Sequence, residues 1–285
     1  MTNILHELKP GQFREVNRHP FYIKHDLVNH PAFTLERLVE LARKLPAHLV
    51  EYNAGDIPLS LDPKKTPHNG LSVEETIRRI EECKSWMVLK LVELDPVYKQ
   101  ILNDCLDQIA PVVPGMLKRQ AFIFISSPGS VTPYHIDHEY NFLLQIRGSK
   151  HMTIFDPAVV PEEALERFYR GEHRNLVFDQ NQPLESQTCQ LLPGDGVHVP
   201  VTAPHYVING PDVSISFSIT FRTPQGDRRA KVYQFNDRLR RAGLKPRAVG
   251  TTPLIDKAKY FGYALFTRTQ RLLGRGEKKN GTSNR

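Results

Sequence analysis

SVTPYHIDHEYNFLLQIRGSKHMTIFDP spans residues 130–157, and LLPGDGVHVPVTAPHYVINGPDVSISFSITF spans residues 191–221. Each stretch is a series of short apolar runs, many of them alternating with polar residues and bounded by Gly, Pro, Asn or Asp. This pattern is typical of an all-β sandwich or barrel. We therefore expect strands at residues 121–126, 141–146, 151–155, 188–192, 196–200, 206–208 and 214–221, with one helix at 161–170.

Helix start signals dominate the residues before this β region. Thr34 precedes a helical run at residues 35–45. Ser72 and Glu75 have the spacing of a capping box, in which each side chain accepts a hydrogen bond from the other residue's backbone N–H. We expect the helix that they open to continue to residue 91.

A third helix is expected after Asp95, because Pro96 suits the first helical position. Residues 53–70 are rich in Pro, Gly and Asn and predict an irregular loop. Residues 1–118 are thus expected to be mostly helical.

The chain of 285 residues is long enough to bury a sizeable core. We predict a helical region at residues 1–114 that packs on the barrel and a β core at 115–222. A basic helical extension follows at 223–285, with helices at about 226–242 and 255–273.

Positive charge is concentrated at the C-terminal end. Residues 222–285 carry 17 Lys and Arg against 4 Asp and Glu, a net charge of +13, whereas the rest of the chain carries 21 against 27, a net charge of −6. Such a basic tail could contact an anionic surface, either nucleic acid or lipid. A solvated helix face is the simpler alternative.

The N-terminal residues lack the apolar stretch of a signal peptide, and no run approaches the roughly 18 apolar residues of a membrane span. We expect a cytoplasmic protein with no transmembrane segment. Cys83, Cys105 and Cys189 form no CxxC pair, so they indicate neither a zinc knuckle nor a disulfide framework.

The candidate chemistry begins with His135 and Asp137. They are two residues apart in an expected strand, so both side chains lie on one face and can reach one ion together. His205 stands at the start of another expected strand. If the two strands are neighbours, two imidazoles and one carboxylate meet, which is the ligand set of non-haem Fe(II) oxygenases. His198 is the main rival ligand, because strand alternation could also aim it inward. It lies seven residues before His205 and fails the spacing of the second motif described below, so we expect a pocket or core histidine.

The first stretch resembles the first motif of the cupin superfamily, Gly-x5-His-x-His-x3-Glu-x6-Gly. Gly129, His135, Asp137, Asn141 and Gly148 hold its spacing, with Asp in place of the second His and Asn in place of Glu. These two exchanges are those of the JmjC-type hydroxylases within the superfamily.

The second stretch resembles the second cupin motif, Gly-x5-Pro-x-Gly-x2-His-x3-Asn. Gly194, Pro200, His205 and Asn209 match, and Thr202 replaces the middle Gly. We expect this departure to alter a turn without affecting a ligand.

Within the JmjC hydroxylases, the chain is most similar to the asparaginyl-hydroxylase type. That resemblance implies that Lys150 pairs with the distal carboxylate of 2-oxoglutarate and that Thr132 adds a hydroxyl group. It also implies that Asn141 lies near the metal-chelating end of this cosubstrate. A lysine facing a buried carboxylate would form a charge-assisted hydrogen bond.

The resemblance implies a mainly β fold with flanking helices, a double-stranded β-helix or jelly roll. It also implies an Fe(II)- and 2-oxoglutarate-dependent dioxygenase that uses O₂, hydroxylates a protein side chain or a small molecule, and releases succinate and CO₂. Two alternatives stay open: an N-methyl demethylase with the same chemistry, and a metal-binding cupin-like regulatory protein that does not oxidise. A homodimer formed through the C-terminal helices is a further expectation.

Overall fold

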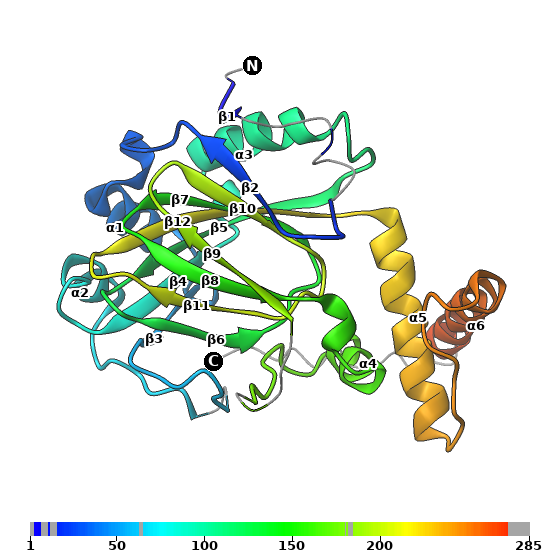
Figure 1. The fold of residues 1–285 in the computed structure, drawn as a ribbon. Coiled ribbons are helices and arrows are strands. Elements are labelled where there is room, and N and C mark those ends of the chain that lie inside the picture. Colours follow the sequence, from blue (N-terminus) through cyan, green and yellow to red (C-terminus); the bar gives the residue numbers. More distant parts are fainter. Residues whose placement is uncertain are drawn as a thin grey trace. The chain divides into compact units, whose positions relative to one another are not determined.

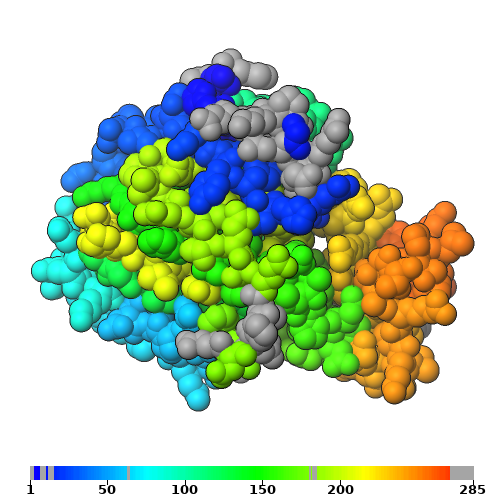
Figure 2. All heavy atoms as spheres, in the orientation of Figure 1, coloured from blue at the N-terminus to red at the C-terminus, as the bar shows by residue number. Residues whose placement is uncertain are grey.

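The computed structural model of the chain describes residues 3–6, 11, 16–62, 65–179, 181 and 185–272. The chain divides into two compact units. The β unit comprises Met1–Val159 and Asn175–Arg222, and the helical unit comprises Val160–Arg174 and Thr223–Arg285. Figure 1 shows the sheets of the β unit and the helices of the helical unit, and Figure 2 shows how side chains fill the spaces between the ribbons.

Two antiparallel sheets make up the β unit, as far as the chain is described. The large sheet has the strand order β1-β2-β10-β7-β12-β5-β4-β3 and the small sheet the order β6-β11-β8-β9. The strands of the large sheet are β1 Leu5–His6, β2 Phe21–His25, β3 Val50–Ala54, β4 Ser85–Lys90, β5 Leu117–Ser126, β7 Tyr140–Arg147, β10 Asp195–Val199 and β12 Ser214–Arg222. Those of the small sheet are β6 Val131–His135, β8 Lys150–Phe155, β9 Ser186–Leu191 and β11 His205–Asn209.

The two sheets pack face to face, because one apolar cluster draws residues from both. Leu143 and Val197 of the large sheet belong to it together with Met152 and Val207 of the small sheet. We call the surfaces that meet here the inner faces. The predicted mainly β fold with flanking helices, a double-stranded β-helix, is confirmed.

Alternation along β12 separates the two sides of the large sheet. Ile215, Phe217 and Ile219 belong to the main core on the outer face. Since successive side chains on a strand point to opposite faces, Ser216 and Ser218 lie on the inner face. The inner face of the barrel is therefore partly polar.

Three helices cover the outer face and contribute to the main core: α1 Leu35–Lys44, α2 Val73–Arg78 and α3 Pro96–Ile109. Their predicted starts are confirmed. The Thr34 hydroxyl accepts a hydrogen bond from the N–H of Arg37, Ser72 and Glu75 form the complete capping box, and the Asp95 carboxylate accepts from the N–H of Val97.

The expected helix at residues 73–91 is wrong beyond its first turns. It ends at Arg78, and Ser85–Lys90 is strand β4, which pairs with β3 and β5. Five of its six residues are buried, so pairing within the sheet outweighs the local helix signal. Strands β2 and β3 likewise show that residues 1–118 are not mostly helical.

The helical unit contains α4 Glu162–Arg170, α5 Pro224–Arg241 and α6 Pro253–Leu272. The guanidinium of Arg240 donates to Glu166 at 2.7 Å, and that of Arg170 donates to Asp237 at 2.7 Å. Helices α5 and α6 confirm the helices predicted at about 226–242 and 255–273, up to Leu272. Residues 273–285, the end of the expected basic tail, lie outside the described residues.

None of the helices described is both long enough and apolar enough to cross a membrane.

Candidate metal centre

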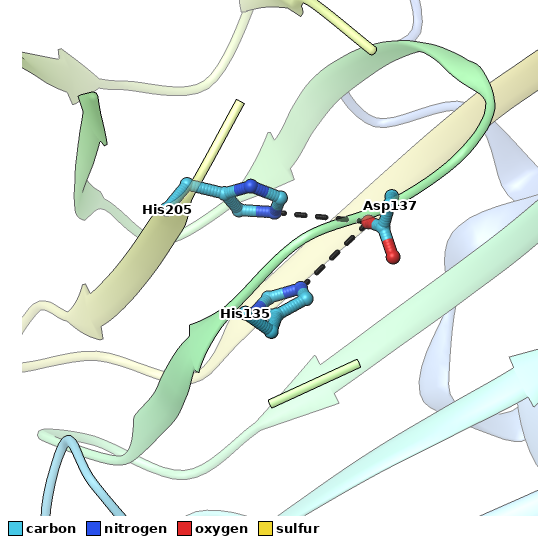
Figure 3. A group of neighbouring side chains, drawn as sticks. All are labelled: His135, Asp137 and His205. Atoms are coloured by element: carbon cyan, nitrogen blue, oxygen red, sulfur yellow. Dashed lines mark ion pairs between the residues drawn. The ribbon is translucent and has the colours of Figure 1, made fainter. Parts of the chain in front are cut away.

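His135, Asp137 and His205 come together at one end of the barrel (Figure 3). His135 ends β6 and His205 begins β11, and the two residues are direct partners in the pairing of these strands. The Nε2 atoms of both rings lie 3.7 Å from Oδ2 of Asp137. Because a metal bonds each atom at about 2.1 Å, one ion can reach all three.

The protonation of both rings is set by the backbone. Nδ1 of His135 lies 2.6 Å from the carbonyl oxygen of Pro133, and Nδ1 of His205 lies 2.9 Å from that of Ala203. A carbonyl oxygen only accepts hydrogen bonds, so each Nδ1 carries the proton and donates it. Each Nε2 then keeps its lone pair on the side of Asp137, the tautomer that a metal ligand requires.

Asp137 follows β6 and is held by a turn of the second motif. The N–H of Thr202 donates to the carbonyl oxygen of Asp137 at 2.8 Å. Thr202 has a φ of 61°, the left-handed conformation that glycine adopts most easily. The turn is thus kept despite the exchange of Gly for Thr. The N–H that holds the backbone of Asp137 is one that Gly or Thr supplies equally, so the exchange leaves this bond in place.

Two loops lie along the outer edge of β6, the edge away from β11. The N–H of Tyr134 donates to Leu59 at 2.9 Å, and the N–H of Leu176 donates to Tyr134 at 3.0 Å. Ser60 and Phe178 link the two loops to each other. In Figure 2 these loops, light blue and yellow-green, lie next to each other at the lower edge. The strand that carries His135 is therefore paired on both sides.

Thr132 reaches the inner face through an irregularity in β6. Thr132 and His135 are three residues apart, which on a regular strand would place them on opposite faces. The pairing of β6 with β11 shifts register between His205 and Val207, so that Thr132 lies opposite Val207. Val207 belongs to the inner cluster. A bulge thus brings Thr132 to the same side as His135 and His205.

Asn141 lies on the inner face at the start of β7, two residues before Leu143 of the inner cluster. It is buried, with 7% of its surface exposed. The hydroxyl of Ser218 donates to its Oδ1 at 2.8 Å. Its expected role beside the metal stays a prediction.

Lys150 begins β8 on the same face as Met152 and Ile154 of the inner cluster. It is 3% exposed, and among the residues described burial is the one influence on the pKa of its amine, with no carboxylate as partner. Burial lowers the pKa of Lys150 to about 7. A buried amine without a counter-charge is costly, and an anionic ligand between the sheets would relieve that cost.

His198 is not part of the site. It lies on the outer face of β10, with its ring 4.6 Å from that of Phe142. Nδ1 lies 3.0 Å from the Asn141 carbonyl oxygen, and Nε2 accepts from the N–H of Asn17 at 2.9 Å. Burial lowers the pKa of His198 to about 3, so the ring stays neutral. Both nitrogens are occupied by backbone groups, and His198 is a core residue.

Ser218 is a buried residue of the inner face that the sequence did not single out. The alternation in SISFSITF places small hydroxyl residues on one face and large apolar residues on the other. That pattern signals a polar inner face. It does not signal that Ser218 meets Asn141, which is 77 residues away in the chain.

In a comparison with known proteins, residues 71–227 match the family model described as Cupin-like domain. Lysine-specific demethylase 8 of Danio rerio is 29% identical over 102 residues. That match covers 33% of this chain and only 24% of the demethylase.

Solved structures with a similar fold include YcfD of Escherichia coli. One has a TM-score of 0.54 at 17% identity and covers 94% of this chain and 70% of that one. Another, YcfD described as a ribosomal oxygenase in complex with cobalt and 2-oxoglutarate, has a TM-score of 0.50 at 16% identity and covers 93% and 68%. At these identities the match concerns the fold.

Proposed function

Because the chain belongs to the family of cupin-like domains, we propose that it is an Fe(II)- and 2-oxoglutarate-dependent dioxygenase with His135, Asp137 and His205 as metal ligands. The observation that carries this proposal is the cluster itself, whose ligand atoms all lie within 4.8 Å of one another. Two imidazoles and one carboxylate leave three positions of an octahedral ion open, as non-haem Fe(II) oxygenases require. Structural zinc sites use four ligands, commonly including cysteine.

Three inner-face residues would hold 2-oxoglutarate. Lys150 would pair with the distal carboxylate, Thr132 would add a hydroxyl group, and Asn141 would lie near the end that chelates the metal. The buried amine of Lys150, without a carboxylate partner in the described part of the chain, supports this assignment most strongly. YcfD, solved in complex with cobalt and 2-oxoglutarate, shares the fold and supports 2-oxoglutarate as the cosubstrate.

An Fe(II) ion bound there would couple the oxidative decarboxylation of 2-oxoglutarate by O₂ to the hydroxylation of a substrate C–H bond, with release of succinate and CO₂. The protein contributes orientation and a dry site. The carbonyls of Pro133 and Ala203 hold both imidazoles ready for the ion. Met152, Ile154 and Val207 of the inner cluster exclude water beside it.

We favour hydroxylation of a protein side chain or a small molecule over N-methyl demethylation. Thr132, Asn141 and Lys150 all follow the asparaginyl-hydroxylase pattern, and all three lie on the inner faces. YcfD is described as a ribosomal oxygenase, whereas the Danio rerio relative is described as a demethylase. A cupin-like regulatory protein without oxidase activity is the alternative from another class.

Turnover of 2-oxoglutarate tests the proposal. With Fe(II), O₂ and 2-oxoglutarate, we expect the protein to form succinate, and to form none when Fe(II) is left out. A mass increase of 16 Da in a candidate substrate would identify hydroxylation, and release of formaldehyde would identify demethylation. If 2-oxoglutarate neither binds nor yields succinate, the protein is a non-catalytic metal-binding protein instead.

We also propose that α6 pairs with a second copy of the chain. Leu254, Phe261 and Leu265 lie along one stripe of α6 and are 81%, 58% and 66% exposed. An exposed apolar stripe of this kind marks an interaction surface. Contact with an anionic surface is the alternative, because the extension is basic.

Replacing both Phe261 and Leu265 by Glu is expected to halve the mass in solution measured by light scattering, because the charges cannot be buried between two helices. Replacement of Val97 by Glu, at an exposed apolar position on α3, serves as the control. An unchanged mass would remove the dimer role. Binding of the unaltered chain to phosphatidylserine vesicles, with no dimer, would favour the alternative.

A further inference from the structure

Ser218 is a buried hydroxyl residue on the inner face of β12. It is 2% exposed and pairs across the sheet with Leu143 of β7, which belongs to the inner cluster. Its hydroxyl donates to Oδ1 of Asn141 at 2.8 Å. The contact therefore joins the last strand of the barrel to the residue expected beside the metal.

This hydrogen bond determines which end of the Asn141 amide faces Ser218. The oxygen and the NH₂ group of an amide have nearly the same shape, but the oxygen accepts hydrogen bonds and the NH₂ group donates two. In a turned amide the NH₂ group could donate to the Ser218 oxygen, but the Ser218 hydroxyl hydrogen would lose Oδ1 of Asn141 as its acceptor. A buried hydroxyl that loses its acceptor is costly, so the oxygen stays at Ser218 and the NH₂ group faces away from it.

The backbone of Asn141 is fixed as well. Its carbonyl oxygen lies 3.0 Å from Nδ1 of His198, whose ring is packed against Phe142 and Phe21 on the outer face. Its Cα partners are Val199 of β10 and Thr220 of β12. Strand pairing on both sides and the bond to His198 fix the backbone of Asn141. The orientation of its amide is then the property that the Ser218 hydroxyl controls.

We infer that Ser218 is a positioning residue, whose hydroxyl presents the NH₂ group of Asn141 as a hydrogen-bond donor to the metal-chelating carboxylate of 2-oxoglutarate. The inference rests on the proposed function. Without the Ser218 hydroxyl, the amide can turn over and present its oxygen to that carboxylate. Two acceptors then face each other, and the affinity for 2-oxoglutarate falls.

A double-mutant cycle tests this role through the dissociation constant of 2-oxoglutarate, measured by calorimetry on the Zn(II)-loaded protein, which cannot turn over. We expect Ser218→Ala and Asn141→Ala each to weaken binding about tenfold, the effect of one hydrogen bond to a charged group. The double variant should bind no more weakly than Asn141→Ala alone, because Ser218 acts through Asn141.

Ser216→Ala is the matched control. Ser216 lies two residues away on the same face and is equally buried, and its hydroxyl donates to Gln145 at 2.6 Å. It should lower the melting temperature about as much as Ser218→Ala while leaving the dissociation constant unchanged. Emission of Trp86, the single tryptophan of the chain, should match that of the unaltered protein in every variant and so report an intact fold.

Two outcomes would overturn the role of Ser218: unchanged binding in Ser218→Ala, or losses in the two single variants that simply add in the double variant. Both leave the proposed function standing, because the unaltered protein still binds 2-oxoglutarate. If the unaltered protein does not bind 2-oxoglutarate at all, the proposed function fails and this inference fails with it.

Discussion

Replacing Asp137 by Ala is expected to abolish 2-oxoglutarate turnover while leaving the protein folded. Asp137 supplies the oxygen that lies 3.7 Å from both Nε2 atoms, so its loss leaves two neutral ligands. Changes to groups that only support metal ligands already cost about 10- to 100-fold in metal affinity or activity. Loss of a ligand should cost more than about 100-fold in metal affinity.

The fold should survive this change. The bond that holds the Asp137 segment comes from its main-chain carbonyl, which accepts from the N–H of Thr202 and is kept in the variant. Metal affinity by calorimetry, succinate formation and melting temperature together check the prediction. Asp212→Ala, at an exposed residue before β12, is the control. His135→Ala should behave like Asp137→Ala, and turnover retained in either variant would refute the site.

Replacing Lys150 by Met is expected to weaken 2-oxoglutarate binding by about 10- to 100-fold, the effect of losing a charged hydrogen-bond donor. The same variant should melt at a higher temperature without ligand, because Met keeps the apolar stem and removes a buried, unpaired amine. Few other roles for Lys150 would combine weaker binding with greater stability.

The pH dependence of stability follows from the same residue. The pKa of Lys150 is lowered from 10.5 to about 7 in the folded protein. Between pH 7 and 10.5 the unfolded chain therefore binds more protons at this position than the folded one. The free energy of unfolding rises with pH across that window, because the destabilisation caused by the buried charge is progressively removed. Below pH 7 the amine is charged in both states and its burial penalty is complete.

Binding of 2-oxoglutarate should show the opposite trend. An anionic carboxylate favours the charged amine, so affinity should decline as pH rises above 7, by up to tenfold for each further pH unit. Titrations at pH 6.5, 7.5 and 8.5 check this, with Lys150→Met expected to show a flatter profile. Lys99→Met, at an exposed position on α3, is the control. An unchanged affinity in Lys150→Met would refute the cosubstrate assignment.

Most strands and two members of the His–Asp–His cluster could be predicted because their signals are local. His135 and Asp137 share one short segment, and strand alternation gives the face of a residue such as Ser218 directly. Helix caps such as Thr34 are local too, and the structure contains them. The proximity of His205 to this pair depends on the pairing of β11 with β6. No local signal predicts that pairing, and we expected it from the resemblance to the two cupin motifs.

The errors come from features that depend on distant neighbours. The capping box at Ser72 starts a helix correctly, but nothing local ends it before β4. The turns on either side of β4 place Lys84 and Leu91 at φ values of 45° and 53°, where glycine would have been the usual signal. The bulge that brings Thr132 to the inner face exists only in the pairing of β6 with β11.

Each imidazole of the centre is tied to a carbonyl two residues earlier in its own strand or turn. The rings are therefore oriented before any ion binds, so ordering them costs little free energy when the ion binds. The donor set does not by itself select iron, because the affinities of divalent ions for such donors rise from Mn²⁺ through Fe²⁺ to Cu²⁺. Which metal the purified protein carries would then report the supply in the cell or the growth medium.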